Sequence, residues 1–177
     1  MKLHLGCGPC YIPEFTHVDV VPFEHVDIVS SIDNLGMVAD GSAELVYACH
    51  VLEHFPRKRT LPVLKEWRRV LRPGGMLRLS VPDFGVCARL YVEEQASLAD
   101  VIGPLVGGQT YLYNFHYNIF DEPSLTALLE EAGFVDVQRW DWRTTEHAEV
   151  DDFSQAYLPH MDKEKGTLIS LNLEATK

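Results

Sequence analysis

The sequence predicts an α/β fold with a mostly parallel sheet, an antiparallel last strand and shortened helices between the first three strands. Three observations lead to this prediction. The short apolar run Leu3-His4-Leu5 ends at a glycine turn, as a strand ending at a loop would. Strand-like and helix-like patterns then alternate along the chain. No helical pattern directly precedes the final strand, which leaves that strand free to insert antiparallel.

The first part of the chain is rich in strand patterns and poor in helical ones. Strands are expected at 3–5, 17–21, 26–29 and 44–49. Eight residues separate Gly8 from His17 and seven separate Asp19 from Asp27, which is too few for full helices. One face of the sheet is therefore expected to be partly uncovered, and an exposed apolar face suggests a homodimer.

The later elements follow from periodicity and from helix stop signals. From Arg59 onward apolar residues recur every three or four positions, and Pro73-Gly74-Gly75 ends this helical pattern. The remaining expectations are a strand at 76–81, a helix from Pro123 to Gly133, and strands at 135–140 and 167–175. Residues 1–177 are expected to form one domain, with a substrate-side excursion at about 85–121 and a lid or interface loop at about 143–166.

Charge and hydropathy limit the partners and the location. A net charge of −11 makes nucleic acid or an anionic membrane an improbable main partner. Eight of the fifteen Lys and Arg residues lie between Arg57 and Arg78, a pattern more typical of the solvated face of a helix than of an anion-docking patch. Apolar runs stay far below the roughly 20 residues that span a bilayer, and no signal-peptide pattern follows Met1. We therefore expect a cytoplasmic protein without membrane insertion and with reduced thiols.

The opening loop Cys7-Gly8-Pro9-Cys10 admits three interpretations. A thioredoxin-type redox pair would open a long helix, but Pro13 falls where that helix would run. A zinc site would need two further ligands, and the nearest candidates, Cys49, His50 and His54, are separated from Cys10 by an interval far longer than that of a zinc finger. Both interpretations remain open but are disfavoured.

The third interpretation is a glycine loop that carries two incidental thiols. A dinucleotide fingerprint would need glycine at position 11, which is Tyr. What remains is a short Gly-x-Gly turn after a strand, with Asp19 at the end of the next strand. A carboxylate in that place can accept hydrogen bonds from two neighbouring ribose hydroxyls.

An ordered set of motifs resembles the class I, Rossmann-like S-adenosylmethionine (SAM)-dependent methyltransferases, in the small type-11-like bacterial form. The motifs are Leu3-His4-Leu5-Gly6-Cys7-Gly8, His17-Val18-Asp19, Asp40-Gly41-Ser42-Ala43-Glu44-Leu45-Val46, Cys49-His50-Val51-Leu52-Glu53-His54-Phe55, and the run from Glu66 to Gly75 that contains R-V-L-R-P-G-G. The resemblance covers residues 3 to about 81 and implies SAM as the cofactor and methyl transfer as the activity.

The resemblance also implies the cofactor-binding residues. Gly6, Cys7 and Gly8 would face the methionine part of SAM, and Asp19 would hold the ribose. The loop around Ser31 and Ile32 would touch adenine. Cys49 and His50 would line the wall beside the sulfonium. The chain departs from the family where an acid follows the third strand, because Ser31 takes that place and Asp33 is only close to it.

Residues for the acceptor side follow from the chemistry of methyl transfer. An oxygen or nitrogen nucleophile must lose a proton, so His50, His54 and His116 are the catalytic candidates. Further substrate-side candidates are Glu53, Asp83, Tyr113 and His160. Simpler roles are also open: helix capping for His50 and His54, a turn for Asp83, and an aromatic core around Tyr113 and His116. No metal site is expected.

The predicted function is therefore methyl transfer to an O or N nucleophile of a small molecule or glycan. An alternative is a catalytically silent partner subunit that binds SAM or S-adenosylhomocysteine without turnover. A zinc or thiol redox protein using Cys7 and Cys10 is the less favoured class.

Overall fold

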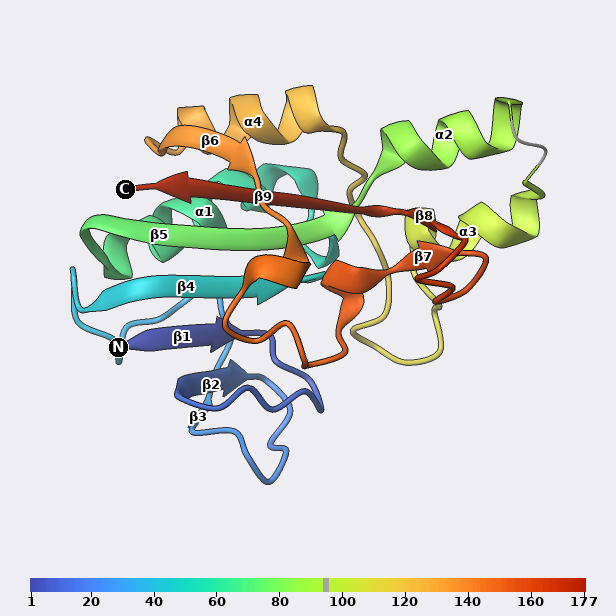
Figure 1. Ribbon diagram of the computed structural model, residues 1–177. Coiled ribbons are helices and arrows are strands. Elements are labelled where there is room, and N and C mark those ends of the chain that lie inside the picture. The colour runs from blue at the N-terminus through green and yellow to red at the C-terminus, as the bar shows by residue number, and fades with distance from the viewer. Residues whose placement is uncertain (94–95) are drawn as a thin grey trace.

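A seven-stranded sheet with helices on one face forms the body of the protein in the computed structural model, which describes residues 1–93 and 96–177 (Figure 1). The strand order is β3-β2-β1-β4-β5-β9-β6. The strands are β1 (Lys2–Leu5), β2 (Phe15–Asp19), β3 (Ile28–Val29), β4 (Ala43–Cys49), β5 (Leu71–Pro82), β6 (Val135–Arg139) and β9 (Ser170–Thr176). Only β9 pairs antiparallel with its neighbours, β5 and β6, so the predicted α/β fold with an antiparallel last strand is confirmed.

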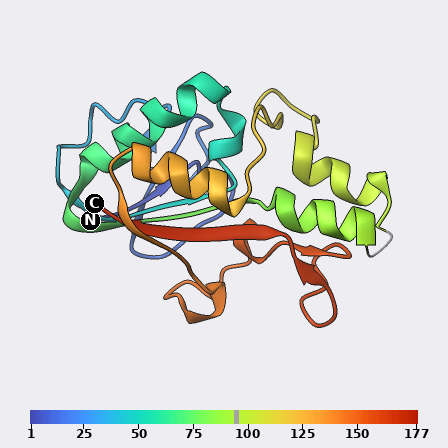
Figure 2. The same cartoon turned by 90° about the horizontal axis from the view of Figure 1, so that it is seen from above.

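Two helices, α1 (Arg57–Val70) and α4 (Glu122–Glu131), cover one face of the sheet (Figure 2). The apolar stripe of α1 is fully buried and includes Val63, Leu64 and Trp67. Trp67 Nε1 also donates a hydrogen bond to the carbonyl oxygen of Ile32 at 2.9 Å, which ties the loop after β3 to this helix. The Asp121 side chain caps α4 by accepting from the backbone N–H of Ser124 at 3.0 Å.

Full helices are absent between β1, β2 and β3, as predicted, but the shortened helices expected there are absent too, because the described residues between these strands form only turns and bends. The opposite face is covered beside β4, β5 and β9. Two 3₁₀ turns, η2 (Trp142–Thr144) and η3 (Phe153–Gln155), lie in the segment that covers it (Figure 2). Trp140, His147 and Gln155 are buried there, and Trp140 Nε1 donates to the carbonyl oxygens of Leu79 and Leu173 at 3.2 Å each. Much of the expected lid or interface loop is therefore a cover for the sheet. The homodimer stays a prediction.

Three features differ from the sequence-based expectations. The Pro73-Gly74-Gly75 turn is a bulge inside β5: the pairing with β4 jumps from Ala43↔Leu71 to Leu45↔Met76, and Gly74 has φ +71°. The excursion at 85–121 contains two helices, α2 (Phe84–Glu93) and α3 (Leu98–Val106). A small hairpin, β7 (Tyr157–Leu158) with β8 (Thr167–Leu168), precedes β9.

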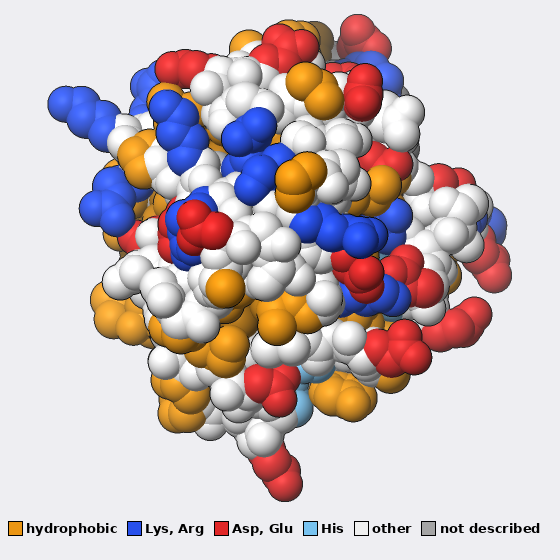
Figure 3. Space-filling model, turned by 90° about the vertical axis from the view of Figure 1, so that its left-hand side faces the viewer, with side chains coloured by type: hydrophobic (Ala, Val, Ile, Leu, Met, Phe, Trp, Pro, Cys, Tyr) orange, Lys and Arg blue, Asp and Glu red, His pale blue; other side chains and the backbone are white. Residues whose placement is uncertain are grey.

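Several of the clustered cations of α1 and β5 form ion pairs with acidic side chains. Arg69 pairs with Asp40 and Glu66, and Arg78 pairs with Glu146 and Glu174. On the side of the molecule where both termini lie, Lys and Arg side chains stand among Asp and Glu side chains (Figure 3). This arrangement favours a solvated helix face over an anion-docking patch. None of the helices in the described ranges has the length and hydrophobicity needed to span a bilayer.

Candidate functional site

The glycine loop after β1 is held against the segment that follows β4. Gly6 has φ +63° and donates its backbone N–H to the carbonyl oxygen of Val18 at 2.8 Å. A Cβ atom at Gly6 would lie 2.6 Å from Val51 Cγ1, which is closer than two carbon atoms can approach. Only glycine therefore fits at position 6, and the loop after β1 packs directly on the segment after β4.

Asp19 lies at the carboxyl end of β2, next to the open space beside the glycine loop. Its side chain is 7% exposed, and Oδ2 accepts the backbone N–H of Gly8 at 2.8 Å while Oδ1 accepts that of Val21 at 2.8 Å. Gly8 has φ +53°, and no atom lies within 4 Å of the place where its Cβ would be. Each carboxylate oxygen keeps a further lone pair for a ligand hydroxyl. These residues fit the ribose and the backbone-facing part of a nucleoside cofactor.

The two thiols of the opening loop are held in their protonated form. Burial raises the pKa of Cys7 to about 12 and that of Cys10 to about 11. The thiolate is the reactive and metal-binding form, so neither residue has the electropositive surroundings of a redox centre. Within residues 1–93 and 96–177, no cysteine joins a group of three or more potential metal ligands. The structure thus disfavours the redox and zinc interpretations of Cys7 and Cys10.

The loop after β3 contains Ser31 and Ile32, the residues predicted to contact adenine. Ser31 is exposed, and its hydroxyl donates to Asp33 Oδ1 at 2.5 Å, while Asp33 Oδ2 forms an ion pair with Arg59 at 2.5 Å. Ile32 is buried in the main core, so its side chain presents almost no surface to a ligand. Adenine contacts from Ser31 and Ile32 remain predictions.

A buried carboxylate and three histidines meet at the carboxyl edge of β4. We refer to His50, Glu53, His54 and His116 as the Glu53 cluster. Glu53 is fully buried in η1 (Leu52–His54), His50 Nδ1 lies 3.6 Å from Glu53 Oε1, and His116 Nε2 lies 4.0 Å from the same oxygen. The rings of His54 and His116 meet edge-on, with centroids 4.8 Å apart.

His116 reaches this cluster because its segment is fastened to η1. The backbone N–H of Tyr117 donates to the Glu53 carbonyl oxygen at 2.8 Å, and Asn118 Nδ2 donates to the Phe55 carbonyl oxygen at 2.5 Å. A Cβ on Gly107 would lie 2.5 Å from the Asn114 carbonyl oxygen, so the close approach of α3 to this segment requires glycine. The excursion predicted at 85–121 therefore delivers one side chain to the edge of the sheet.

Burial dominates the protonation of the Glu53 cluster. It raises the pKa of Glu53 to about 8 and lowers the pKa of His50 to about 3, with His116 and His54 adding to the decrease. Burial also lowers the pKa of His116 to about 4, and it lowers the pKa of His54. In the protein alone at neutral pH, the histidines are neutral and the Glu53 carboxyl group tends to keep its proton.

The other substrate-side candidates have different interactions. Asp83 Oδ1 accepts from the Val86 backbone N–H at 3.2 Å, and Oδ2 lies 3.4 Å from Arg139, so Asp83 caps α2 and forms an ion pair. Tyr113 and His160 are exposed. Among the described residues, no hydrogen bond, ion pair or ring contact joins either of them to the Glu53 cluster.

Sequence reasoning missed two residues beside His50. Ser170 Oγ lies 3.0 Å from His50 Nε2, and the Phe153 ring lies 5.5 Å from the His50 ring. Ser170 begins β9, whose antiparallel direction brings its first residues to the carboxyl edge of the parallel strands. The alternating polar residues Ser170 and Asn172 in an otherwise apolar strand are the signal that could have identified this contact.

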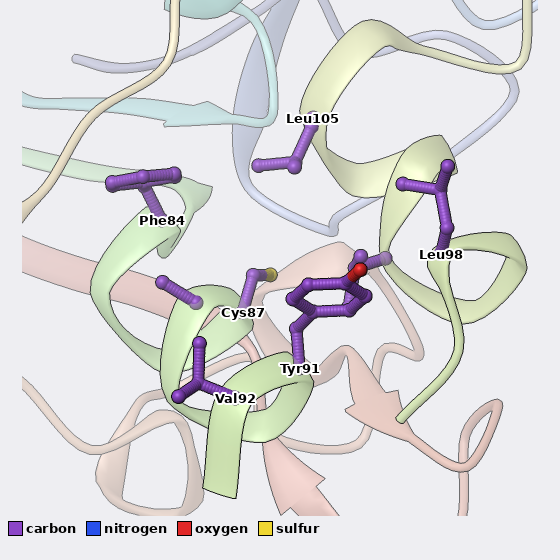
Figure 4. Close-up of a pocket in the computed structure, with 8 residues that line it drawn as sticks. Phe84, Cys87, Tyr91, Val92, Leu98 and Leu105 are labelled. Atoms are coloured by element: carbon purple, nitrogen blue, oxygen red, sulfur yellow. The ribbon is translucent and has the colours of Figure 1, made fainter. Parts of the chain in front are cut away.

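An apolar pocket of about 240 Å³ lies between α2 and α3. Phe84, Cys87 and Tyr91 of α2 face Leu98 and Leu105 of α3 (Figure 4). Burial raises the pKa of Cys87 to about 11, so its thiol stays protonated. The pocket offers apolar surface but no charged group for chemistry.

Comparison with known proteins agrees with this arrangement. Residues 14–79 match the family described as a methyltransferase domain. A SAM-dependent methyltransferase from Archaeoglobus fulgidus is similar with a TM-score of 0.59 and 16% identity, over 99% of this chain and 85% of that one. A possible histamine N-methyltransferase from Thermotoga maritima is similar with a TM-score of 0.59 and 16% identity, over 99% and 81%.

A third similar structure contains bound ligands. It is the 1,6-didemethyltoxoflavin-N1-methyltransferase of Burkholderia thailandensis with 1,6-didemethyltoxoflavin and S-adenosylhomocysteine, with a TM-score of 0.58 and 19% identity, over 99% of this chain and 70% of that one. No curated protein matches the chain. The chain shares the class I, Rossmann-like fold of solved SAM-dependent methyltransferases, and residues 14–79 match a methyltransferase domain, in agreement with the motifs. The methyltransferase domain matched by residues 14–79 implies SAM as the cofactor.

Proposed function

We propose that the protein transfers a methyl group from SAM to an oxygen or nitrogen of a small molecule or glycan. The observation that carries this proposal is the buried Asp19 carboxylate. It accepts a hydrogen bond from the backbone N–H of Gly8, and the space beside Gly8 is open to a ligand. When bound, SAM supplies an electrophilic methyl group on a sulfonium, and the protein supplies binding and orientation.

On the cofactor side, Asp19 would accept hydrogen bonds from the two ribose hydroxyls. Gly6, Cys7 and Gly8 would let the methionine part of SAM approach the backbone. Ser31, with Asp33 beside it, would supply polar atoms near adenine. Cys49 and His50 would form the adjoining wall. The protonated thiols of Cys7 and Cys49, whose pKa values burial raises, suit a contact role because they add no competing nucleophile.

The acceptor side would lie at the Glu53 cluster, because one residue joins the two halves of the site. Val51 packs on Gly6, and its neighbours His50 and Glu53 belong to the cluster. The reacting atoms would thus meet between the glycine loop and the histidines. His50, His54 and His116 would hydrogen-bond the acceptor's O–H or N–H and hold it toward the cofactor.

The class of acceptor is supported by the surface beside the cluster and by relatives. Tyr111, Tyr113 and Tyr117 are exposed in the segment that delivers His116, and such rings can stack on sugar or heteroaromatic faces. Two similar structures are described as an N1-methyltransferase and a putative O-methyltransferase. These features support an oxygen or nitrogen acceptor on a compact molecule or a glycan.

Turnover is tested by following S-adenosylhomocysteine release from SAM with panels of glycans, phenols and heteroaromatic amines. We expect at least one panel to raise release well above the acceptor-free rate, and Asp19→Ala to abolish the increase. That variant guards against a contaminating methyltransferase, whose activity would not change. Cofactor binding without turnover on any panel would contradict the proposal and favour the silent partner subunit.

A further inference from the structure

We propose that Glu53, His54 and His116 form a binding site for one divalent transition-metal cation of the zinc class. One potential ligand atom from each of these residues lies within 4.8 Å of the other two. They come from η1 and from the segment after α3, so the fold assembles the site from two separate parts of the chain.

The Glu53 carboxylate lacks the partners that a buried acid normally has. Its side chain is fully buried, and in the described part of the chain neither Oε1 nor Oε2 has a hydrogen-bond partner. The nearby ring nitrogens of His50 and His116, at 3.6 and 4.0 Å, are too distant to donate to it. Since leaving a buried polar group without a partner is costly, the carboxylate points into a place where a ligand is expected.

The surrounding hydrogen bonds fix which nitrogen of each ring carries the proton. His116 Nδ1 lies 2.9 Å from the Pro104 carbonyl oxygen, which can only accept, so Nδ1 donates and Nε2 keeps its lone pair toward Glu53. His54 Nδ1 donates in the same way to the Phe115 carbonyl oxygen at 3.1 Å, which leaves Nε2 unprotonated. Metal-binding histidines usually donate their other ring N–H to a carbonyl or carboxylate in this way.

His50 is oriented by a chain of hydrogen bonds with a defined direction. Asn172 Nδ2 donates to the Ser154 carbonyl oxygen at 2.9 Å, so Asn172 Oδ1 accepts from Ser170 Oγ at 2.9 Å. Ser170 Oγ has then used its proton and must accept from His50 Nε2 at 3.0 Å. His50 Nδ1 therefore turns a lone pair toward Glu53. The imidazoles of His54 and His116 and the Glu53 carboxylate thus offer one ligand atom each within 4.8 Å of one another, with the His50 lone pair beside Glu53, and a cation would satisfy this group.

The donor set favours one chemical class of cation. Two imidazoles with one carboxylate are a common zinc set, whereas Mg²⁺ and Ca²⁺ prefer oxygen ligands. With metal–ligand distances of about 2.1 Å, donors in a tetrahedral site lie about 3.4 Å apart, so the side chains would close inward on binding. The remaining position would be open to His50 Nδ1 or to a substrate. An acceptor bound there would lose its proton more readily, a step that rests on the proposed function.

Metal binding is tested on the chelator-treated protein of residues 1–177 in the absence of SAM and acceptor. We expect one Co²⁺ per chain with visible absorption bands from imidazole and carboxylate ligation, displaced by Zn²⁺ and unaffected by excess Mg²⁺. Glu53→Gln and His116→Asn should each weaken Co²⁺ binding at least 100-fold. The exposed-histidine control His160→Asn should leave both stoichiometry and spectrum unchanged, since His160 lies in the turn between β7 and β8.

The readouts separate this inference from the proposed function. Unchanged S-adenosylhomocysteine affinity in Glu53→Gln or His116→Asn shows that the variant is folded. The metal site would be overturned if the wild type did not bind Co²⁺, or if both variants bound Co²⁺ as tightly as the wild type. Glu53 would then be a protonated carboxyl group without a metal. Stoichiometric binding abolished by either variant supports the site even if no acceptor is ever methylated. Full turnover by the metal-free protein would overturn the catalytic role of the cation.

Discussion

Replacing Asp19 with alanine should weaken S-adenosylhomocysteine binding by about 30- to 1,000-fold. The carboxylate would accept hydrogen bonds from two ribose hydroxyls. Losing two charge-assisted hydrogen bonds at a buried site costs about 2–4 kcal/mol of binding free energy. At about 1.4 kcal/mol per tenfold change, that range gives the stated loss of affinity. The side chain is 7% exposed and already ordered by the Gly8 and Val21 N–H groups, so little of its interaction is screened by solvent.

Asp27→Ala is the matched control for this perturbation. Asp27 Oδ2 accepts the backbone N–H of His17 at 2.8 Å, so its loss also removes a carboxylate that braces β2. We expect its affinity for S-adenosylhomocysteine to stay within about threefold of the wild type, a change under about 0.7 kcal/mol. Calorimetric titration of both variants, with thermal unfolding to confirm the fold, makes the comparison. A folded Asp19→Ala protein with wild-type affinity would refute the assignment of Asp19 to the ribose.

The remaining predictions concern stability and pH. Gly6→Ala should lower the free energy of unfolding by about 2–4 kcal/mol, because φ is +63° and Val51 Cγ1 would lie 2.6 Å from the new Cβ; a stability equal to the wild type in urea unfolding would contradict the close approach. Trp67→Ala should cost about 3–5 kcal/mol, since Trp67 is 0% exposed and donates to Ile32; a loss below about 1 kcal/mol would mean that this core is not packed as described. Burial lowers the pKa of His4 to about 3, against 6.5 for the exposed group, so the unfolded state binds the additional proton between these values and stability falls as pH decreases. His4→Phe should reduce that slope by up to about 1.4 kcal/mol per pH unit near pH 5 in unfolding experiments; an unchanged slope would show that His4 is not the group involved.

The parts of the fold that sequence predicted are those whose signal is local. The apolar stripe through Val63, Leu64 and Trp67 defines α1 by its spacing alone, and Pro123 with Ser124 marks the first turn of α4. The helices α2 and α3 were not predicted because they contain residues that disfavour helix in isolation: Gly85 in α2, and Gly103 and Pro104 in α3. Tertiary contacts decide their conformation.

The cover over the helix-free face could not be predicted for a related reason. Trp140 and His147 are far in sequence from the strands on which they pack, and nothing local distinguishes this segment from an exposed loop. The excess of polar residues there indicated a surface loop, whereas burial of its aromatic side chains decides its position.

In the candidate site, too, the residues placed by local sequence could be predicted and those placed by distant segments could not. Gly6, Gly8 and Asp19 could be proposed because a strand, a tight turn and the end of the next strand have a fixed spatial relation. His50 and Glu53 lie on one short segment and could be grouped from sequence. The arrival of His116 and Ser170 could not, because each depends on how a distant segment docks.

One titration tests most directly whether the glycine loop and Asp19 bind S-adenosylhomocysteine, the product that SAM leaves after methyl transfer. Purified, chelator-treated wild-type protein would be titrated calorimetrically with S-adenosylhomocysteine, with NAD as the control ligand. We expect micromolar binding of one S-adenosylhomocysteine per chain and no heat from NAD. Absence of S-adenosylhomocysteine binding by a folded protein, or equal binding of NAD, would contradict this expectation.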